Sequence, residues 1–393
     1  MMSLPVLSPD LITEILSWLP VKVLVRSRCV CKQWKSLIFD PRFAKLHLER
    51  SPKHTHTLLT ILDNVNGTWV VSLIHSVRRL LEHPSSNVNE DVSCRFKNQS
   101  YHAIGSTNGL VCLIGDKSDD DGNREEIFIR FWNPTLRLRS KKSPTLCNTS
   151  SDFNLYSVHL GFGYDDLGDK YKVVAVFWDH TVQKWEGKVH CMGDSCWRNT
   201  LACHDFPTLL RTLIGQFVKG SVNWLSLKNL NCHGYEWENV TMEQLVIFSL
   251  DLRKETCRYM LLPDGFGEKP QDEPELAVLR GCLCLYYTHM KTHFVLWEMR
   301  EFGVQESWTR LVNISYVHLQ LNDFEPEWLL LPVCLSENRD VLVLASTQSW
   351  DDVIMYNQKD GRVQHIEFPY NQIWYAYEHI KSLVLPCPHP HPH

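Results

Sequence analysis

Two stretches of the sequence carry residue types that bind nucleotides or metal ions in other proteins. The first, 161–168 (GFGYDDLG), has closely spaced glycines but matches neither the dinucleotide-binding pattern nor the Walker pattern, and an apolar strand follows it instead of a helix. The second, 119–123 (DDDGN), resembles part of a calcium loop, but its glycine is misplaced and no glutamate closes the loop. Both stretches are therefore predicted to be turns.

Cysteine, histidine and acidic residues are plentiful, but their spacing indicates no metal site and no catalytic set. Three pairs of nearby cysteines lack the spacing of paired zinc knuckles, and no Gly-x-Ser-x-Gly elbow is present. Histidines alternate with prolines over 387–393, which is typical of an extended, disordered tail. We therefore expect no catalytic residue, no metal and no cofactor. The cysteine pairs are Cys29 and Cys31, Cys191 and Cys196, and Cys282 and Cys284.

Composition narrows the class of protein. The chain has 393 residues, 44% of them hydrophobic and 22% charged, which is ordinary for a globular protein of one small and one large domain. A net charge of −5 gives no general case for nucleic-acid binding. The amino end does not read as a signal peptide, so the 14 cysteines are expected to be reduced and the location cytoplasmic or nuclear. No run approaches the roughly 20 apolar residues of a membrane span.

Basic side chains gather in two places. Arg137, Arg139, Lys141 and Lys142 either dock an acidic substrate or form the charged edge of a strand that discourages aggregation, and we favour the edge. A second set lies near the amino end and would suit an acidic partner surface, mainly by steering association. That set comprises Lys22, Arg26, Arg28, Lys32 and Lys35.

The first fifty residues carry the signals of short helices. Ser8 can cap a helix that begins at Pro9, where the missing N–H costs nothing, and Asp10 suits the positive end of the helix dipole. Apolar residues follow at helical spacing until Pro20 ends the helix. Further helical segments are expected over 21–29 and 30–39, with a last turn after Pro41.

This helical block holds more large apolar side chains than a unit of its size can bury. Fewer than about 50 residues make a weak core, and each large apolar side chain stabilises by roughly 1.5–3 kcal/mol once it is buried. Two interpretations stay open: a cap packed on the domain that follows, or a module that completes its core on another protein. The side chains concerned are Leu7, Leu11, Ile15, Leu16, Leu24, Val30 and Trp34.

The rest of the chain repeats a strand–turn–strand pattern. Glycine opens an apolar strand at Gly109, Gly220 and Gly281, and a second apolar strand follows after a variable loop. The second strands recur at roughly 50–60 residues, with another copy expected near Ile61, which indicates a kelch-like β-propeller of about six blades. A large β-sandwich or two smaller β domains is the alternative. The aligned positions are Trp132, His190, Phe248, Trp297 and Tyr356.

The predicted fold class is therefore α+β with more than one domain: a small three-helix module followed by a large, mainly-β domain. The predicted boundaries are 1–50 for the helical module, 51–57 for a linker, 58–386 for the β domain and 387–393 for the tail.

The helical block resembles the F-box of plant F-box proteins. The likeness is carried by LSPDLITEILSWLPVK (7–22) and RCVCKQWKSLIFDPRF (28–43), with differences at Ser8, where the family usually has proline, and Ser27, where it often has an aromatic residue. The resemblance implies docking on a Skp-type adaptor and, through it, on a cullin scaffold. The implied adaptor-binding residues are Leu7, Leu11, Ile15, Leu16, Leu19, Pro20, Leu24, Val30, Cys31 and Trp34.

The β repeats resemble the plant F-box-associated interaction domain through motifs such as GSTNGLVCL, FWNPTLR, LGFGYDDLGDKYKVV and GQFVKGSVNWL. With the F-box, this resemblance covers almost the whole chain. It implies a non-catalytic substrate receptor of a ubiquitin ligase that holds a target protein for ubiquitination and degradation. A scaffold or sequestering protein that works without ubiquitination is the alternative, and an enzyme with an active site on the propeller axis is a third.

Target binding is expected in the loops between strands, because loops on a rigid scaffold carry most recognition surfaces. Aromatic side chains in those loops are the candidates, since interfaces are enriched in them. They are Trp178, Trp185, Tyr235, Trp237, Trp328 and Trp350. The sequence does not identify the target.

Overall fold

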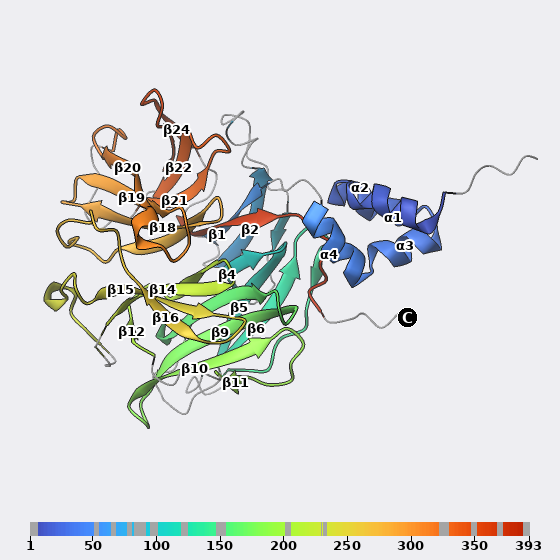
Figure 1. Ribbon diagram of the computed structural model, residues 1–393, viewed down its shortest axis with the longest axis horizontal. Coiled ribbons are helices and arrows are strands. Elements are labelled where there is room, and N and C mark those ends of the chain that lie inside the picture. Colours follow the sequence, from blue (N-terminus) through green and yellow to red (C-terminus); the bar gives the residue numbers. More distant parts are fainter. Residues whose placement is uncertain are drawn as a thin grey trace, which may run out of the picture.

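The computed structural model describes most of the chain as a group of amino-terminal helices followed by β-strands (Figure 1). The described residues are 7–50, 55–63, 68–76, 81, 92–94, 101–118, 125–146, 155–200, 206–228, 230, 234–321, 330–346, 352–367 and 372–387. The turn expected at 119–123, the tail residues 388–393, Trp328 and Trp350 lie outside these ranges.

The helical module, residues 7–50, contains four helices instead of the three predicted. Asp40 accounts for the additional helix, because its Oδ1 accepts a hydrogen bond from the Arg42 N–H at 2.7 Å and caps a full helix where a single turn was expected. Ser8 caps the first helix as predicted, accepting from the Leu11 N–H. The helices are α1 (Pro9–Ser17), α2 (Val21–Ser27), α3 (Lys32–Ile38) and α4 (Pro41–Arg50). None of the described helices is long and apolar enough to cross a membrane.

The strands form four four-stranded sheets and one nine-stranded sheet, which the parallel pairing of β8 with β13 divides into two. The described residues thus form a propeller of six blades, as the repeat spacing predicts. Blade 1 consists of β25 (Gln372–Ile380), β1 (Thr55–Asp63), β2 (Thr68–Ser76) and β3 (Val92–Cys94). Blade 2 consists of β4 (His102–Thr107), β5 (Leu110–Ser118), β6 (Glu125–Asn133) and β7 (Leu138–Arg139). Blade 3 consists of β8 (Val158–Asp165), β9 (Lys170–Asp179), β10 (Lys184–Cys191) and β11 (Arg198–Asn199).

Blades 4 to 6 follow in chain order. Blade 4 consists of β13 (Ile214–Val218), β14 (Ser221–Leu227), β15 (Leu245–Asp251) and β16 (Cys257–Met260), with β12 (Thr208–Leu209) beside β14. Blade 5 consists of β17 (Glu275–Leu279), β18 (Cys282–His289), β19 (His293–Met299) and β20 (Trp308–Ser315). Blade 6 consists of β21 (Leu330–Leu335), β22 (Val341–Ser346), β23 (Asp352–Asn357) and β24 (Val363–Glu367). Three short 3-10 helices complete the described elements: η1 (Leu155–Ser157), η2 (Trp237–Asn239) and η3 (Gln305–Ser307).

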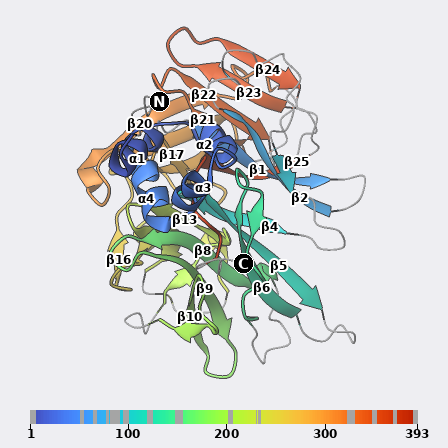
Figure 2. The same ribbon diagram turned by 90° about the vertical axis from the view of Figure 1, so that its right-hand side faces the viewer.

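The first strands of the blades form a ring around the axis. Contacts run from β25 to β4, β8, β13, β17 and β21, and back to β25. The ring is closed by the pairing of β1 with β25, in which Thr55 lies opposite Ile380 and Leu62 opposite Gln372. Strands from near the two ends of the sequence therefore share one blade, and Figure 2 shows the blades spread around the axis behind the helices.

The repeat alignment is correct for five blades and wrong for the first. Trp132, His190, Phe248, Trp297 and Tyr356 lie in β6, β10, β15, β19 and β23, which are the third strands of their blades. Ile61 instead lies in β1, the second strand of its blade. The first blade takes its inner strand from the far end of the chain, so its copy of the repeat begins one strand late.

The glycines that open the second strands lie in two-residue hairpin turns. Both central residues have positive φ in each turn, for example 51° at Asn108 and 79° at Gly109, as in type I′ turns. The turns before Gly220 and Gly281 have the same form. They mark one end of the propeller, which we call the module face, because the first residue of β1 also lies there and the helical module precedes it.

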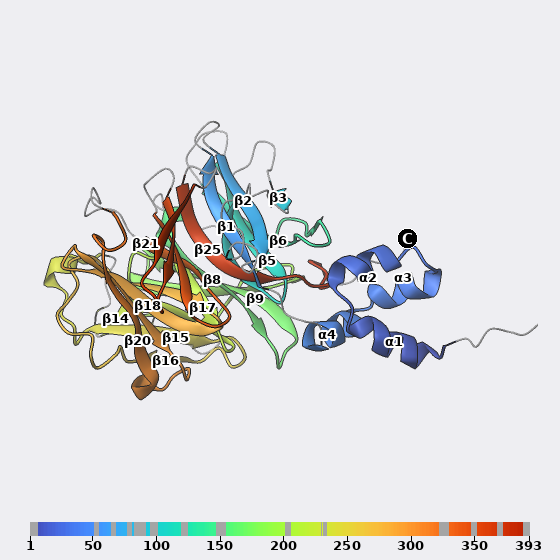
Figure 3. The same cartoon turned by 90° about the horizontal axis from the view of Figure 1, so that it is seen from above.

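Apolar layers fill the spaces between neighbouring blades, and a separate cluster holds the helical module together. That last cluster includes Leu16, Leu24, Ile38 and Phe43 together with Leu383, which follows β25. The helical module therefore shares its core with residues 381–387, which we call the strap. Figures 1 and 3 show the red strap running from the propeller to the helices.

Gly109 and Gly281 give a matched test of how the strap is seated. Alanine at either position is strained by its positive φ, at a cost of about 1–2 kcal/mol. At Gly109 the added Cβ would also lie 2.2 Å from Ser382 Oγ and 2.8 Å from the Ile380 carbonyl oxygen, whereas at Gly281 it meets nothing within 4 Å. We expect Gly109→Ala to lower the free energy of unfolding by about 1–3 kcal/mol more than Gly281→Ala. Equal losses in denaturant unfolding would contradict this seating of the strap.

Candidate functional site

An exposed apolar stripe runs along α1. Leu7, Leu11, Ile15 and Trp18 follow one another at helical spacing and are between 45% and 55% exposed. Val30, between α2 and α3, is 64% exposed, and Val23 of α2 is exposed as well. A contiguous patch of exposed large apolar side chains is typical of an interaction surface.

The opposite side of the same helix is packed. Leu16 of α1 and Leu24 of α2 are almost completely buried in the module's own core, with Leu19 and Trp34 partly buried at its edge. Pro20 and Cys31 are exposed, and Cys31 accepts a hydrogen bond from the Trp34 N–H at 3.4 Å at the start of α3. The structure thus divides the ten predicted adaptor-binding residues into a displayed set and a packed set.

Two members of the displayed surface were missing from the sequence prediction. Trp18 and Val23 are exposed beside the stripe. Trp18 lies seven residues after Leu11, so helical periodicity alone would have indicated it. Its Nε1 donates a hydrogen bond to Glu14 Oε1 at 3.4 Å, which lays the indole along α1.

Polar contacts fix α1 against α4. Arg50 forms an ion pair with Glu14, and this hydrogen bond holds the pKa of the Glu14 carboxyl below its ordinary value. His47 Nε2 lies 2.8 Å from the Leu19 carbonyl oxygen, and burial lowers the pKa of His47, so the ring is neutral at physiological pH. The stripe is therefore held on a rigid support.

The cations expected to face a partner are mostly displayed. Arg28 is only partly exposed, because its guanidinium lies over the Phe39 ring at 4.8 Å and its Nε donates to the Val25 carbonyl oxygen. The other four are exposed: Lys22, Arg26, Lys32 and Lys35.

The strap joins the module to the propeller. Asn133, at the end of β6, is fully buried, and its Nδ2 donates to the Ser382 and Val384 carbonyl oxygens at 3.1 and 2.7 Å. Lys45 of α4 adds an ion pair with Asp169 at 3.6 Å in the turn between β8 and β9. These contacts fix the direction in which the stripe faces relative to the blades.

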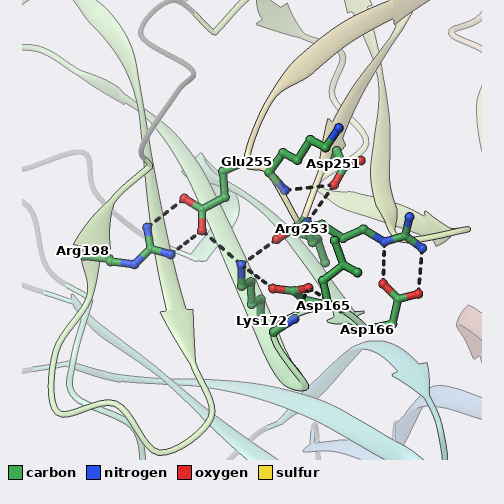
Figure 4. A network of polar contacts seen from close by, with 11 residues as sticks. Asp165, Asp166, Lys172, Arg198, Asp251, Arg253 and Glu255 are labelled. Carbon is green, nitrogen blue, oxygen red and sulfur yellow. Dashed lines mark hydrogen bonds and ion pairs between the residues drawn. The ribbon is translucent and has the colours of Figure 1, made fainter.

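The turn predicted over 161–168 is wrong for 161–165, which lie in β8, and the turn covers only 166–169 before β9. Asp165, the last residue of β8, contributes to a buried network between blades 3 and 4. Lys172 Nζ lies 3.0 Å from Asp165 Oδ2 and 3.3 Å from Glu255 Oε1, and all three side chains are less than a tenth exposed. Arg198 pairs with the other side of Glu255, which lies in a tight turn at φ 56° (Figure 4). Burial acts to raise the pKa of Asp165, but hydrogen bonds from the Gly168 N–H and Lys172 outweigh it and the net pKa is lowered.

Arg253 and Asp166 extend this network toward solvent. Arg253 Nη2 donates to Asp166 Oδ2 at 2.8 Å, and the Arg253 N–H donates to Asp251 Oδ1 (Figure 4). The network thus fastens the turns of blade 4 to blade 3 on the module face. Its signal in the sequence is a lysine inside an otherwise apolar strand, YKVVAVF.

The predicted target-binding aromatics that the structure describes are packed rather than displayed. Trp178 and Trp185 lie opposite each other in β9 and β10, buried, with ring centroids 5.7 Å apart in an edge-on arrangement. Trp237 is buried and donates to the Pro270 carbonyl oxygen at 3.0 Å. Tyr235 donates to Glu273 Oε1 at 2.9 Å, and burial raises the pKa of its hydroxyl. Trp178 and Trp185 thus pack within a hairpin, and Tyr235 and Trp237 stabilise the connection between β14 and β15.

Among the described residues, no group of three or more histidine, cysteine or acidic side chains is placed to hold a metal ion. Arg137 and Arg139 are exposed in and beside β7, the outer strand of blade 2, in agreement with a charged strand edge. Lys142 lies over the Phe128 ring at 3.7 Å.

A helical module with a displayed apolar stripe, fastened to a closed β-propeller, defines a two-part protein in which one part is shaped for contact with another chain. Residues 4–46 match the family model described as F-box domain, and residues 57–383 match the one described as F-box associated beta propeller domain. The second match alone covers most of the chain, so the protein belongs to the family of F-box proteins with an F-box associated β-propeller.

Curated relatives support this assignment over nearly the full length. The chain is 28% identical over 370 residues to the F-box/kelch-repeat protein At3g23880 of Arabidopsis thaliana, covering 91% of this chain and 89% of the relative. It is 24% identical over 402 residues to the F-box protein CPR1 of Arabidopsis thaliana, covering 96% and 88%.

Lys172 tests the network between blades 3 and 4. Lys172→Met would leave Asp165 and Glu255 as buried carboxylates without their shared cation, so we expect the free energy of unfolding to fall by about 3–5 kcal/mol. Lys170→Met, at the exposed first residue of β9 two residues earlier, should change it by less than about 0.5 kcal/mol. Similar denaturant midpoints for the two variants would show that the network contributes little.

Proposed function

We propose that this F-box protein is the substrate-recognition subunit of a Skp–cullin–F-box ubiquitin ligase. In this proposal the helical module binds a Skp-type adaptor and, through it, the cullin scaffold, while the propeller holds a target protein. The single observation that carries the proposal is the stripe of Leu7, Leu11, Ile15 and Trp18, displayed on a module whose other side packs into the module's own core.

The energetics of the stripe favour an obligatory partner. Full burial of a large apolar side chain stabilises by roughly 1.5–3 kcal/mol. About half of the surface of each stripe residue is already covered in the folded chain, so a partner would supply the remaining part of that stabilisation. The neighbouring cations Lys22, Arg26, Lys32 and Lys35 are displayed and would speed association with an acidic adaptor surface. The apolar stripe supplies affinity, and the cations supply rate and orientation.

A rigid connection between the two parts suits a ligase. Holding a target near a ubiquitin-conjugating enzyme raises its effective concentration, and this requires a fixed geometry between the adaptor and the target. The buried contacts of Leu383 and Asn133 support such a connection, and the exposed Lys45–Asp169 pair adds little to it. The protein itself then needs no acid, base or nucleophile, and we propose that it is non-catalytic and acts in the cytoplasm or nucleus.

The target is proposed to dock on the propeller end opposite the module face. Strands alternate in direction, so the turns after β9 and β18 lie at that end, together with the residues that follow β20. Val182, Met290 and Val317 occupy these places and are 52%, 58% and 75% exposed. Exposed apolar side chains on separate loop tips are what a protein target would contact.

Ile15 and Leu16 are adjacent residues that separate binding from folding. Ile15→Ala removes a displayed side chain, so we expect the affinity for a purified Skp-type adaptor to fall by about 1–2 kcal/mol while the thermal unfolding midpoint stays the same. Leu16→Ala opens a cavity in the module core and should instead destabilise the module by about 2–5 kcal/mol. Calorimetric titration and thermal unfolding of both variants give the two readouts. An Ile15→Ala variant that binds as tightly as the parent chain would remove the stripe from the adaptor interface.

A variant that cannot bind the adaptor would act as a trap for targets. The full chain with Leu11→Ala and Ile15→Ala keeps its fold and its propeller, so targets should accumulate on it in cells and be identified by affinity capture. Their half-lives should lengthen when this variant replaces the parent chain. Captured partners whose half-lives respond neither to the substitution nor to proteasome inhibition would favour a sequestering scaffold over a ligase subunit.

A further inference from the structure

A cavity of about 310 Å³ lies on the propeller axis at the module face. Five of the six blades contribute to its wall, almost entirely through their innermost strands β25, β4, β8, β13 and β17. Small-molecule pockets usually measure about 300–1,000 Å³, so this one suits a small compound or a single long side chain.

The wall has a clear electrostatic bias. Glu378 is the one formally charged side chain among the described residues that line the cavity, and Lys and Arg are absent from that lining. Glu378 is partly buried on β25, and its Oε1 accepts a hydrogen bond from the Arg280 backbone N–H at 2.7 Å. The other polar groups of the wall are neutral, namely those of Ser106, Thr107, Asn108 and Gln216.

The groups around Glu378 leave this bias in place. Burial raises the pKa of the Glu378 carboxyl above its ordinary value, and the Arg280 N–H and the charge of the exposed Arg280 side chain offset only part of this rise. His379 Nδ1 lies 2.9 Å from Ser106 Oγ, and burial lowers the pKa of this histidine to about 3, so its ring is neutral. A carboxylate that burial has partly stripped of water gains most from a cation beside it.

We propose that the axial cavity binds an ammonium or guanidinium group, with Glu378 as its counter-ion and Thr107 and Gln216 as neutral hydrogen-bond partners. The group belongs either to a free small amine or to a lysine or arginine side chain of a bound peptide. This site lies on the face that carries the helical module, apart from the apolar loop tips proposed for the target. The test of this site is therefore independent of the test of adaptor binding.

Calorimetric titration of the full chain with Nα-acetylarginine amide, agmatine and Nα-acetylcitrulline amide tests the charge requirement. Nα-acetylarginine amide and agmatine should bind, and Nα-acetylcitrulline amide, which has nearly the same shape and no charged group, should not. A capped peptide with one central arginine between glycines and serines distinguishes the two sources: tighter binding of the peptide indicates a side chain, and binding of the free compounds alone indicates a small amine.

Glu378→Gln keeps an oxygen for the Arg280 N–H and removes the charge, so we expect it to weaken binding of Nα-acetylarginine amide about tenfold or more. Glu337→Gln, on an exposed turn outside the cavity, is the matched control and should leave the affinity unchanged. Gln216→Glu places a second carboxylate in the wall and should tighten binding several-fold. Failure of every cationic probe to bind the folded parent chain would overturn the proposal, as would undiminished binding by Glu378→Gln together with no gain from Gln216→Glu.

Discussion

The pairing of β1 with β25 is the constraint on which the rest of the molecule depends. A propeller blade cannot cover both of its faces alone, so the blades are stable only as a closed ring. Closure rests on a ladder of backbone hydrogen bonds between strands that lie more than three hundred residues apart in the sequence. The same strand, β25, places Glu378 in the wall of the axial cavity and continues into the strap. The register in which β25 pairs with β1 therefore sets both the cavity wall and the position at which the strap packs against the helical module.

The interpretation of the helical block as a cap is right for part of its apolar residues, and the boundary falls between adjacent residues of one helix. Leu16 and Leu24 pack against Leu383, so the block does cap the propeller through its strap. Leu11 and Ile15 stay exposed on the other side of α1. A helix that is apolar around most of its circumference can satisfy two partners at once, one within its own chain and one outside it. Under the proposed function, this double use explains why a short module needs so many large apolar side chains.

Local sequence signals predicted what local physics decides. Caps, prolines and helical spacing located α1 to α3. The repeated strand–turn–strand pattern indicated a propeller of about six blades, and its glycines fall where type I′ turns demand residues such as Asn108 and Gly109. Features that depend on distant partners were not predictable. Whether Trp178 faces solvent depends on its cross-strand neighbour Trp185, and Glu378 and Lys172 gain their meaning only from strands of other blades. Only a last turn was predicted after Pro41, and Asp40 instead caps a full helix there, because a polar residue before proline begins either structure.

Leu383 also sets an order of events during synthesis. A chain grows from its amino end, so α1 to α4 leave the ribosome long before β25 and the strap are made. Until then the module core lacks Leu383, Asn133 lacks the carbonyl groups that it binds, and blade 1 lacks its inner strand. A nascent or prematurely terminated chain thus exposes an incomplete module and an open ring, both recognisable to chaperones and proteases. Only a chain translated through the strap presents the stripe on a firm support.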